Sequence, residues 1–198
     1  MTKSYQTLEL KSNELQPWVE DLGRLRLQIF REFPYLYEGE LEQELDYIGH
    51  YAQAPGSMVV LAFDGGNLIG ATTCLPMGQA QAAFQEPFVK AGLDVSAIGY
   101  LGESVVLSEH RGRGLGKLFF ERRESHLRQQ GCQVATFCAV ERPKDHPLRP
   151  EQYRPLDEYW QGLGYQRQEH LQASFRWRQV DRQAECDNIL TYWTKPLS

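Results

Sequence analysis

The chain has 198 residues, and its 41% hydrophobic and 24% charged residues are the proportions of an ordinary globular protein. Its formal net charge of −5 argues against a protein that coats nucleic acid. The N-terminal residues lack the apolar core of a signal peptide, and no stretch has the roughly eighteen apolar residues of a membrane span. We therefore expect one cytoplasmic domain over residues 1–198, without nucleic-acid or membrane partners.

The first half of the chain predicts strands and helices in alternation. Apolar spacing and turn residues indicate a strand over 5–10, helices over 15–33 and 39–54, two strands within 58–75 and a weaker helix over 79–91. Asp64 to Asn67 form the tight turn between the two strands. Pro87 should end or bend the weaker helix.

The second half continues the alternation. We expect a strand over 98–107, a helix over 114–131, a strand over 133–140, a short helix over 156–164 and strands near 165–180 and 186–195. The last two strands alternate as an antiparallel pair with one solvated face. This mixed order predicts an α/β or α+β sheet covered by helices.

The four cysteines show neither a C-x-x-C spacing nor the paired histidines of a zinc site. They are Cys74, Cys132, Cys138 and Cys186. Four free thiols agree with a reducing cytoplasm, and we expect them to act as small buried hydrophobic residues. The sequence therefore predicts no metal site.

The stretch "RGRGLGK", residues 111–117, joins a predicted strand to a predicted helix. A helix N-terminus presents free backbone N–H groups and a positive dipole end, and glycines let an anion approach closely. A P-loop does not fit, because Leu118 stands where its hydroxyl is required. A dinucleotide fingerprint does not fit either, because Lys117 replaces its third glycine. The stretch still predicts a phosphate or pyrophosphate site.

The remaining pattern, R-x-x-G-x-G at Arg111, Gly114 and Gly116, resembles the pyrophosphate motif of the GNAT superfamily of acyl-CoA-dependent N-acetyltransferases. The stretch "YWQGLGYQR" at 159–167 is similar to the aromatic motif of that superfamily, so the resemblance covers nearly the whole chain. It implies a GNAT-like, mostly antiparallel sheet that splays at the cofactor wedge and is flanked by helices. It also implies acetyl-CoA as co-substrate.

The resemblance assigns the cofactor to the glycine turn and the preceding strand. The turn residues that would wrap the pyrophosphate are Arg111, Gly112, Arg113, Gly114, Leu115, Gly116 and Lys117. The strand residues whose backbone would run beside the pantetheine arm are Val105, Val106 and Leu107, whose side chains are also suited to core packing. The later loop carries Arg142, Lys144, Arg149 and Arg154, which either meet the ribose phosphate or are solvated.

Acetyl transfer to an amine needs a base, because an alkyl ammonium must first lose a proton. Glu103, on the strand before the turn, is the candidate for this base or for an anchor of the acceptor, and a structural role is the alternative. The family often has a tyrosine as general acid where this chain has Trp160. Tyr159 is adjacent and is the remaining candidate, although it points about 100° away from Trp160 on a helix.

The acceptor side in this family involves the first two helices. Residues 31–46 combine aromatic and acidic side chains, which suits a cationic amine, although acids that cap a helix and face solvent explain the same pattern. Tyr35 and Tyr37 are the candidates for acceptor contact. We expect direct acetyl transfer to a primary amine of a small molecule or peptide. A homodimer is compatible with the sequence. A non-catalytic acyl-CoA-binding or sensor module is the alternative.

Overall fold

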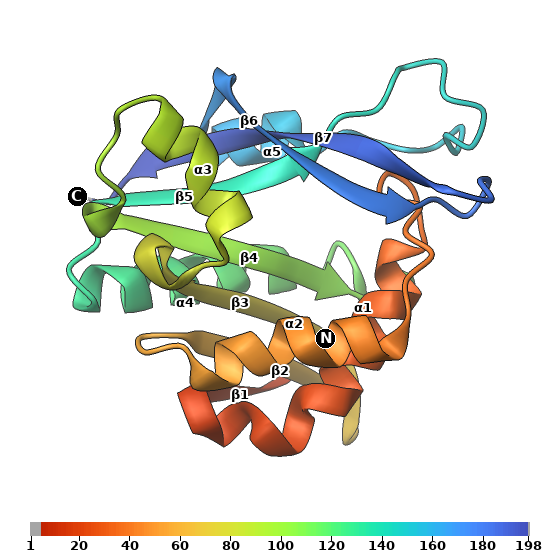
Figure 1. The fold of residues 1–198 in the computed structure, drawn as a ribbon. Helices are drawn as coiled ribbons and strands as arrows, with labels where there is room; N and C mark the ends of the chain where they lie inside the picture. Colours follow the sequence, from red (N-terminus) through yellow and green to blue (C-terminus); the bar gives the residue numbers. More distant parts are fainter. Residues whose placement is uncertain (1–4, 198) are drawn as a thin grey trace.

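A seven-stranded sheet in the order β1-β2-β3-β4-β5-β7-β6 lies at the centre of the computed structural model, which describes residues 5–197 (Figure 1). The strands are β1 (Gln6–Lys11), β2 (Met58–Asp64), β3 (Asn67–Pro76), β4 (Ile98–Val106), β5 (Val134–Val140), β6 (Gln166–Arg178) and β7 (Glu185–Pro196). Neighbouring strands are antiparallel except for β4 and β5, which run parallel. The predicted mixed, mostly antiparallel sheet is therefore confirmed.

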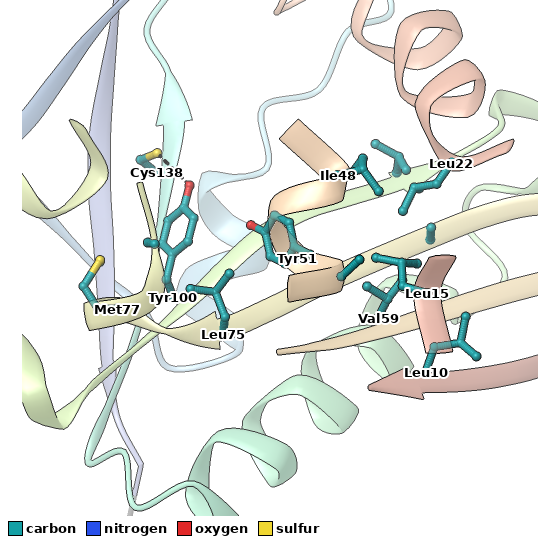
Figure 2. Packing of buried hydrophobic residues seen from close by; sticks show 14 of the residues in the cluster. Leu10, Leu15, Leu22, Ile48, Tyr51, Val59, Leu75, Met77, Tyr100 and Cys138 are labelled. Carbon is teal, nitrogen blue, oxygen red and sulfur yellow. Dashed lines mark hydrogen bonds between the residues drawn. The ribbon is translucent and has the colours of Figure 1, made fainter. Parts of the chain in front are cut away.

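Helices cover both faces of this sheet. They are α1 (Val19–Phe30), α2 (Leu41–Gln53), α3 (Ala82–Lys90), α4 (Leu115–Gln129) and α5 (Asp157–Gly162). The first three pack on one face and the last two on the other, each over its own hydrophobic cluster. Figure 2 shows part of the first cluster, in which Ile48 of α2 and Leu22 of α1 lie above Val59 of β2. No helix within residues 5–197 is long and apolar enough to cross a membrane.

Two of the expected helical segments contain a proline, and their bounds differ from the expected ones. Residues Ser12–Trp18 form a 3-10 helix that contains Pro17, so α1 begins only at Val19. In the second case, Pro87 lies inside α3, and the helix continues to Lys90 instead of ending there. Of the two expected effects of Pro87, an end or a bend, the end is wrong, because one missing N–H near the end of a helix removes only one backbone hydrogen bond.

The sheet opens between β4 and β5. Only Ile98–Tyr100 of β4 pair with β5, opposite Val134–Thr136. On its other edge, β4 stays paired with β3 as far as Val106, with a shift of register between Thr72 and Cys74. Beyond Tyr100, therefore, the β5-facing edge of β4 has no strand partner in the described chain. The expected splay of the sheet is confirmed.

Candidate functional site

The glycine turn that follows β4 has a conformation that needs glycine at two positions. Gly112 and Gly114 have φ angles of 72° and 90°, and a Cβ atom at either would meet no atom within 4 Å. Helix α4 starts at Leu115, and Leu118 N–H donates to Gly114 O at 3.1 Å. Helix geometry leaves the first N–H groups of α4 without intrahelical acceptors. The turn thus presents free donors beside open space, which fits an anion such as a pyrophosphate.

Cations surround this turn, and each is held by a neighbouring group. Arg111 donates to Val106 O at 2.8 Å and forms an ion pair with Glu32 at 2.8 Å. Arg113 donates to the hydroxyl of Tyr5 at 3.2 Å. Because these contacts are exposed, solvent weakens them, and the arginines remain able to turn toward a phosphate.

The strand before the turn exposes backbone groups on its open edge. Leu107 N–H donates to Ile69 O of β3 at 2.9 Å. Because strand residues alternate, the backbone groups of Val106 face the opposite edge, where β5 has separated and where the Val106 carbonyl accepts from Arg111. The side chain of Val105 is buried under α1 and α2, so it belongs to the core. The two expected roles of this strand, backbone contact with the pantetheine arm and core packing by side chains, therefore involve different atoms.

The adjacent aromatic residues of α5 point to different places. The ring of Trp160 packs against Phe137 and Trp193, with centroids 4.9 Å and 5.2 Å away. Tyr159 is instead 40% exposed and packs over Phe120 of α4. Its hydroxyl lies 3.2 Å from the position that a Cβ of Gly116 would take. Tyr159, and not Trp160, is therefore the α5 side chain at the glycine turn.

Glu103 of β4 is buried on the face covered by α1 and α2. Its Oε2 atom accepts from Arg26 of α1 at 2.7 Å and from Tyr47 of α2 at 3.1 Å. Its Oε1 atom is buried and meets no hydrogen-bond donor among the described residues. A buried carboxylate oxygen without a donor is costly, so this atom is suited to receive a proton or an ammonium.

Arg26 joins Glu103 to a second buried carboxylate. Its Nε atom donates to Glu44 of α2 at 2.5 Å, and its guanidinium lies 4.2 Å from the ring centroid of Tyr47. Burial alone would lower the pKa of Arg26, but the nearby Glu103, Tyr47 and Glu44 together raise it above its ordinary value. The guanidinium is therefore charged and serves two carboxylates. The sequence analysis missed this pair, because Arg26 and Glu44 meet only when α1 packs on α2.

The loop between α1 and α2 brings Tyr35 and Tyr37 toward this region. Tyr35 packs against Phe30 and Trp177, with centroids 4.6 Å and 6.2 Å away. Burial raises the pKa of Tyr35, and the charges of Arg26 and Glu103 also act on it. Tyr37 is half-buried beside the same tryptophan, 6.3 Å from its centroid. Both candidate acceptor residues thus share one aromatic cluster near Glu103.

Arg142 binds this loop instead of standing free for a phosphate. It donates to Pro34 O at 2.7 Å, to Tyr35 O at 3.0 Å and to Asn188 Oδ1 at 2.8 Å. Asn188 is almost fully buried in β7. From the sequence Arg142 was expected either to meet the ribose phosphate or to be solvated, because nothing in its neighbourhood along the chain shows that two distant segments meet there.

Another buried arginine lies on the opposite face of the sheet. Arg123 of α4 is 2% exposed, and its guanidinium lies 4.8 Å from the ring centroid of Phe120. It donates to two backbone carbonyls, those of Phe119 and Glu103, and forms no ion pair within residues 5–197. Burial lowers its pKa. The Arg123 guanidinium therefore lies on the α4 side of the sheet, beside the part of β4 where its register with β3 shifts.

The model of the Acetyltransferase (GNAT) family matches residues 23–150. No curated protein sequence matches the chain significantly. Among solved structures, an N-acetyltransferase from Staphylococcus aureus Mu50 is 9% identical, with a TM-score of 0.61 over 99% of this chain and 100% of that one. A ribosomal-protein-alanine N-acetyltransferase from Brucella melitensis is 12% identical, with a TM-score of 0.60 over 96% and 99%. A Salmonella typhimurium protein solved with its cofactor acetyl-CoA is 13% identical, with a TM-score of 0.58 over 99% and 95%.

Proposed function

The chain belongs to the GNAT acetyltransferase family, and from this premise we propose that it transfers the acetyl group of acetyl-CoA directly to a primary amine. Acetyl-CoA, the acyl donor of the family, supplies the acetyl group as a thioester. In the reaction the amine nitrogen forms a bond to the acetyl carbon, and the carbon–sulfur bond breaks. The observation that carries the proposal is the buried, unpaired Oε1 atom of Glu103.

For the cofactor, we assign the pyrophosphate to the turn of residues 111–117. The free N–H groups at the start of α4 bind the anion, and the open space at Gly112 and Gly114 lets it approach. The unpaired edge of β4 offers backbone donors and acceptors to an extended ligand arm. Of the three residues assigned to this arm, Val105, Val106 and Leu107, it is Val106 whose backbone faces the open edge, whereas Leu107 N–H is paired with β3.

For the acceptor, we assign the first proton transfer to Glu103. An amine that enters as an ammonium places its N–H against Oε1, and the carboxylate takes the proton directly or through one water. Arg26 and Tyr47 hold the other oxygen, so the carboxylate cannot rotate freely. The neutral amine is then held near the carbonyl that it attacks. Tyr35 and Tyr37 form part of the wall on this side.

For the leaving thiolate, we assign the proton donor to Tyr159. Its hydroxyl lies at the first turn of α4, on the side of the glycine turn. Burial raises its pKa above the ordinary value, so the phenol keeps its proton at neutral pH. It therefore suits a general acid, although Trp160 holds the position in which the family often has a tyrosine.

The test is Glu103→Gln, assayed by thiol release with acetyl-CoA and a panel of amines. We expect kcat to fall by about 10² or more, because the amide cannot accept the proton. The dissociation constant of acetyl-CoA should stay unchanged, because the cofactor binds elsewhere. Glu86→Gln, an exposed change on α3, is the control and should leave kcat intact. Equal turnover of the two variants at every pH would exclude Glu103 as the base.

A further inference from the structure

We propose that the acceptor is a small primary amine without a carboxylate or phosphate next to its nitrogen, and not the amine of a peptide or protein. This inference rests on the proposed function, because it takes Glu103 as the group that meets the amine. Three features of the molecule support it: the depth of Glu103, the closure of the α1–α2 loop, and the engagement of the surrounding cations.

The depth of Glu103 limits the size of the acceptor. The residue is 5% exposed, and its free Oε1 atom is buried. Tyr47 and Arg26 hold the other oxygen from α2 and α1. An amine that reaches Oε1 must therefore be enclosed together with the atoms around its nitrogen. A small molecule meets this condition more easily than a peptide, whose bulky units next to the amine would have to be enclosed as well.

The α1–α2 loop closes one end of the sheet. Glu38 N–H donates to Arg178 O, and Val180 N–H donates to Leu36 O, both at 2.8 Å. Between them, Tyr37 and Gln179 form an antiparallel bridge. In Figure 1 the loop rises from α1 and reaches the end of β6. The loop thus continues the sheet edge, and its backbone groups are no longer available to pair with an extended peptide.

Two further contacts hold the loop shut. Arg142 binds the carbonyls of Pro34 and Tyr35, as described above. Phe33 packs against Tyr153 of the loop that follows β5, with centroids 4.7 Å apart. A peptide would have to break contacts to both segments before it could lie across this end of the sheet. The free energy needed to open these contacts would be subtracted from the binding free energy of the peptide.

The charges near Glu103 disfavour an anionic acceptor. Arg26 is shared by Glu103 and Glu44, and its exposed fraction is 8%. Three other cations of this side are engaged as well: Arg31 pairs with Glu38, Arg142 binds carbonyls, and Arg149 lies 4.9 Å from the ring centroid of Tyr153. A carboxylate next to the acceptor nitrogen would come close to two buried carboxylates and find no free guanidinium among these four. Like charges brought together in this way cost binding free energy.

The test compares amines with their carboxylated counterparts. The probes are 2-phenylethylamine and phenylalanine, tryptamine and tryptophan, and cadaverine and lysine, assayed by thiol release at saturating acetyl-CoA. Phenylalanine amide separates charge from size, and peptides with a free N-terminal phenylalanine or an internal lysine test chain length. We expect at least one free amine to exceed its carboxylated counterpart by about tenfold or more in kcat/KM, which is about 1.4 kcal/mol. The peptides should be poorer still.

The outcomes separate this inference from the proposed function. If phenylalanine amide behaves like 2-phenylethylamine while phenylalanine does not, charge is the cause, as proposed. A peptide or a carboxylated amino acid that equals or exceeds the best free amine overturns the inference and leaves the proposed function in place. Absence of thiol release with every probe contradicts both. The Glu103→Gln variant, assayed on the best amine, then shows whether the measured turnover depends on Glu103.

Discussion

The two ends of the proposed site, the one assigned to the cofactor and the one assigned to the acceptor, are built by different means. At the cofactor end, the chain offers backbone N–H groups, two glycines with positive φ angles and exposed arginines. At the acceptor end, it offers buried side chains from several segments, joined by short polar contacts around Glu103. The first end is a local arrangement of seven consecutive residues, whereas the second exists only when α1, α2 and β4 have come together.

Substitutions at the two ends should therefore affect different properties of the protein. A change at Gly112 or Gly114 of the turn affects ligand binding but few interior contacts, because these two glycines face open space. A change among the buried polar groups affects folding as well as chemistry, because each group stabilises another.

Arg26→Met should destabilise the fold strongly. It leaves Glu44 and Glu103 buried without their cation, and breaking a buried pair in this way costs about 3–5 kcal/mol. The matched control is Arg24→Met on the same helix, whose pair with Glu20 is exposed. It should change the free energy of unfolding by no more than about 1 kcal/mol. Urea unfolding of both variants measures the difference, and equal losses would show that the acceptor end is not the polar core described here.

Tyr159→Phe should lower kcat by about 10²-fold, the lower end of typical acid–base contributions, because the leaving thiolate loses its proton donor. The melting temperature should hardly change, because the ring remains and Tyr159 is 40% exposed. Steady-state kinetics with a small amine measures the effect. An unchanged kcat together with an unchanged dissociation constant for acetyl-CoA would assign the proton donor elsewhere.

Arg142→Gln should raise the KM of the acceptor by about fivefold, equivalent to ~1 kcal/mol of lost hydrogen bonding to the α1–α2 loop. The KM of acetyl-CoA should stay the same, because Arg142 does not contact the glycine turn. Lys144→Gln, on the same loop and exposed, is the control. If Arg142→Gln weakens acetyl-CoA and spares the acceptor, Arg142 belongs to the cofactor end.

Tyr37→Ala should have the smallest effect, raising the KM of the acceptor by about threefold, or ~0.6 kcal/mol. Tyr37 is half-buried at the edge of the aromatic cluster, and its backbone bridge to Gln179 does not need the ring. Tyr35→Ala removes a ring packed on two others, so it should also lower the melting temperature. A loss of stability with an unaltered acceptor KM in both variants would make these tyrosines core residues only.

The same contrast explains what the sequence could predict. The glycine turn, its strand and its helix are adjacent in the chain, so periodicity and glycine spacing predicted them, and the splay of the sheet followed from the family resemblance. The contacts of Arg26, Glu44 and Arg142 were missed, because their partners lie 18 or more residues away and carry no motif. The orientation of Tyr159 was likewise open until the packing of Trp160 against β5 and β7 fixed the face of α5.

The central claim is that the backbone of the glycine turn holds the cofactor. Calorimetric titration of acetyl-CoA into Gly114→Val and Gly131→Val tests it directly. Both glycines have positive φ angles, 90° and 82°, both face open space, and they lie at opposite ends of α4. The two variants should therefore carry similar backbone strain. We predict that Gly114→Val raises the dissociation constant by about tenfold or more, ~1.4 kcal/mol, and that Gly131→Val leaves it unchanged. Equal affinities in the two variants would contradict the claim.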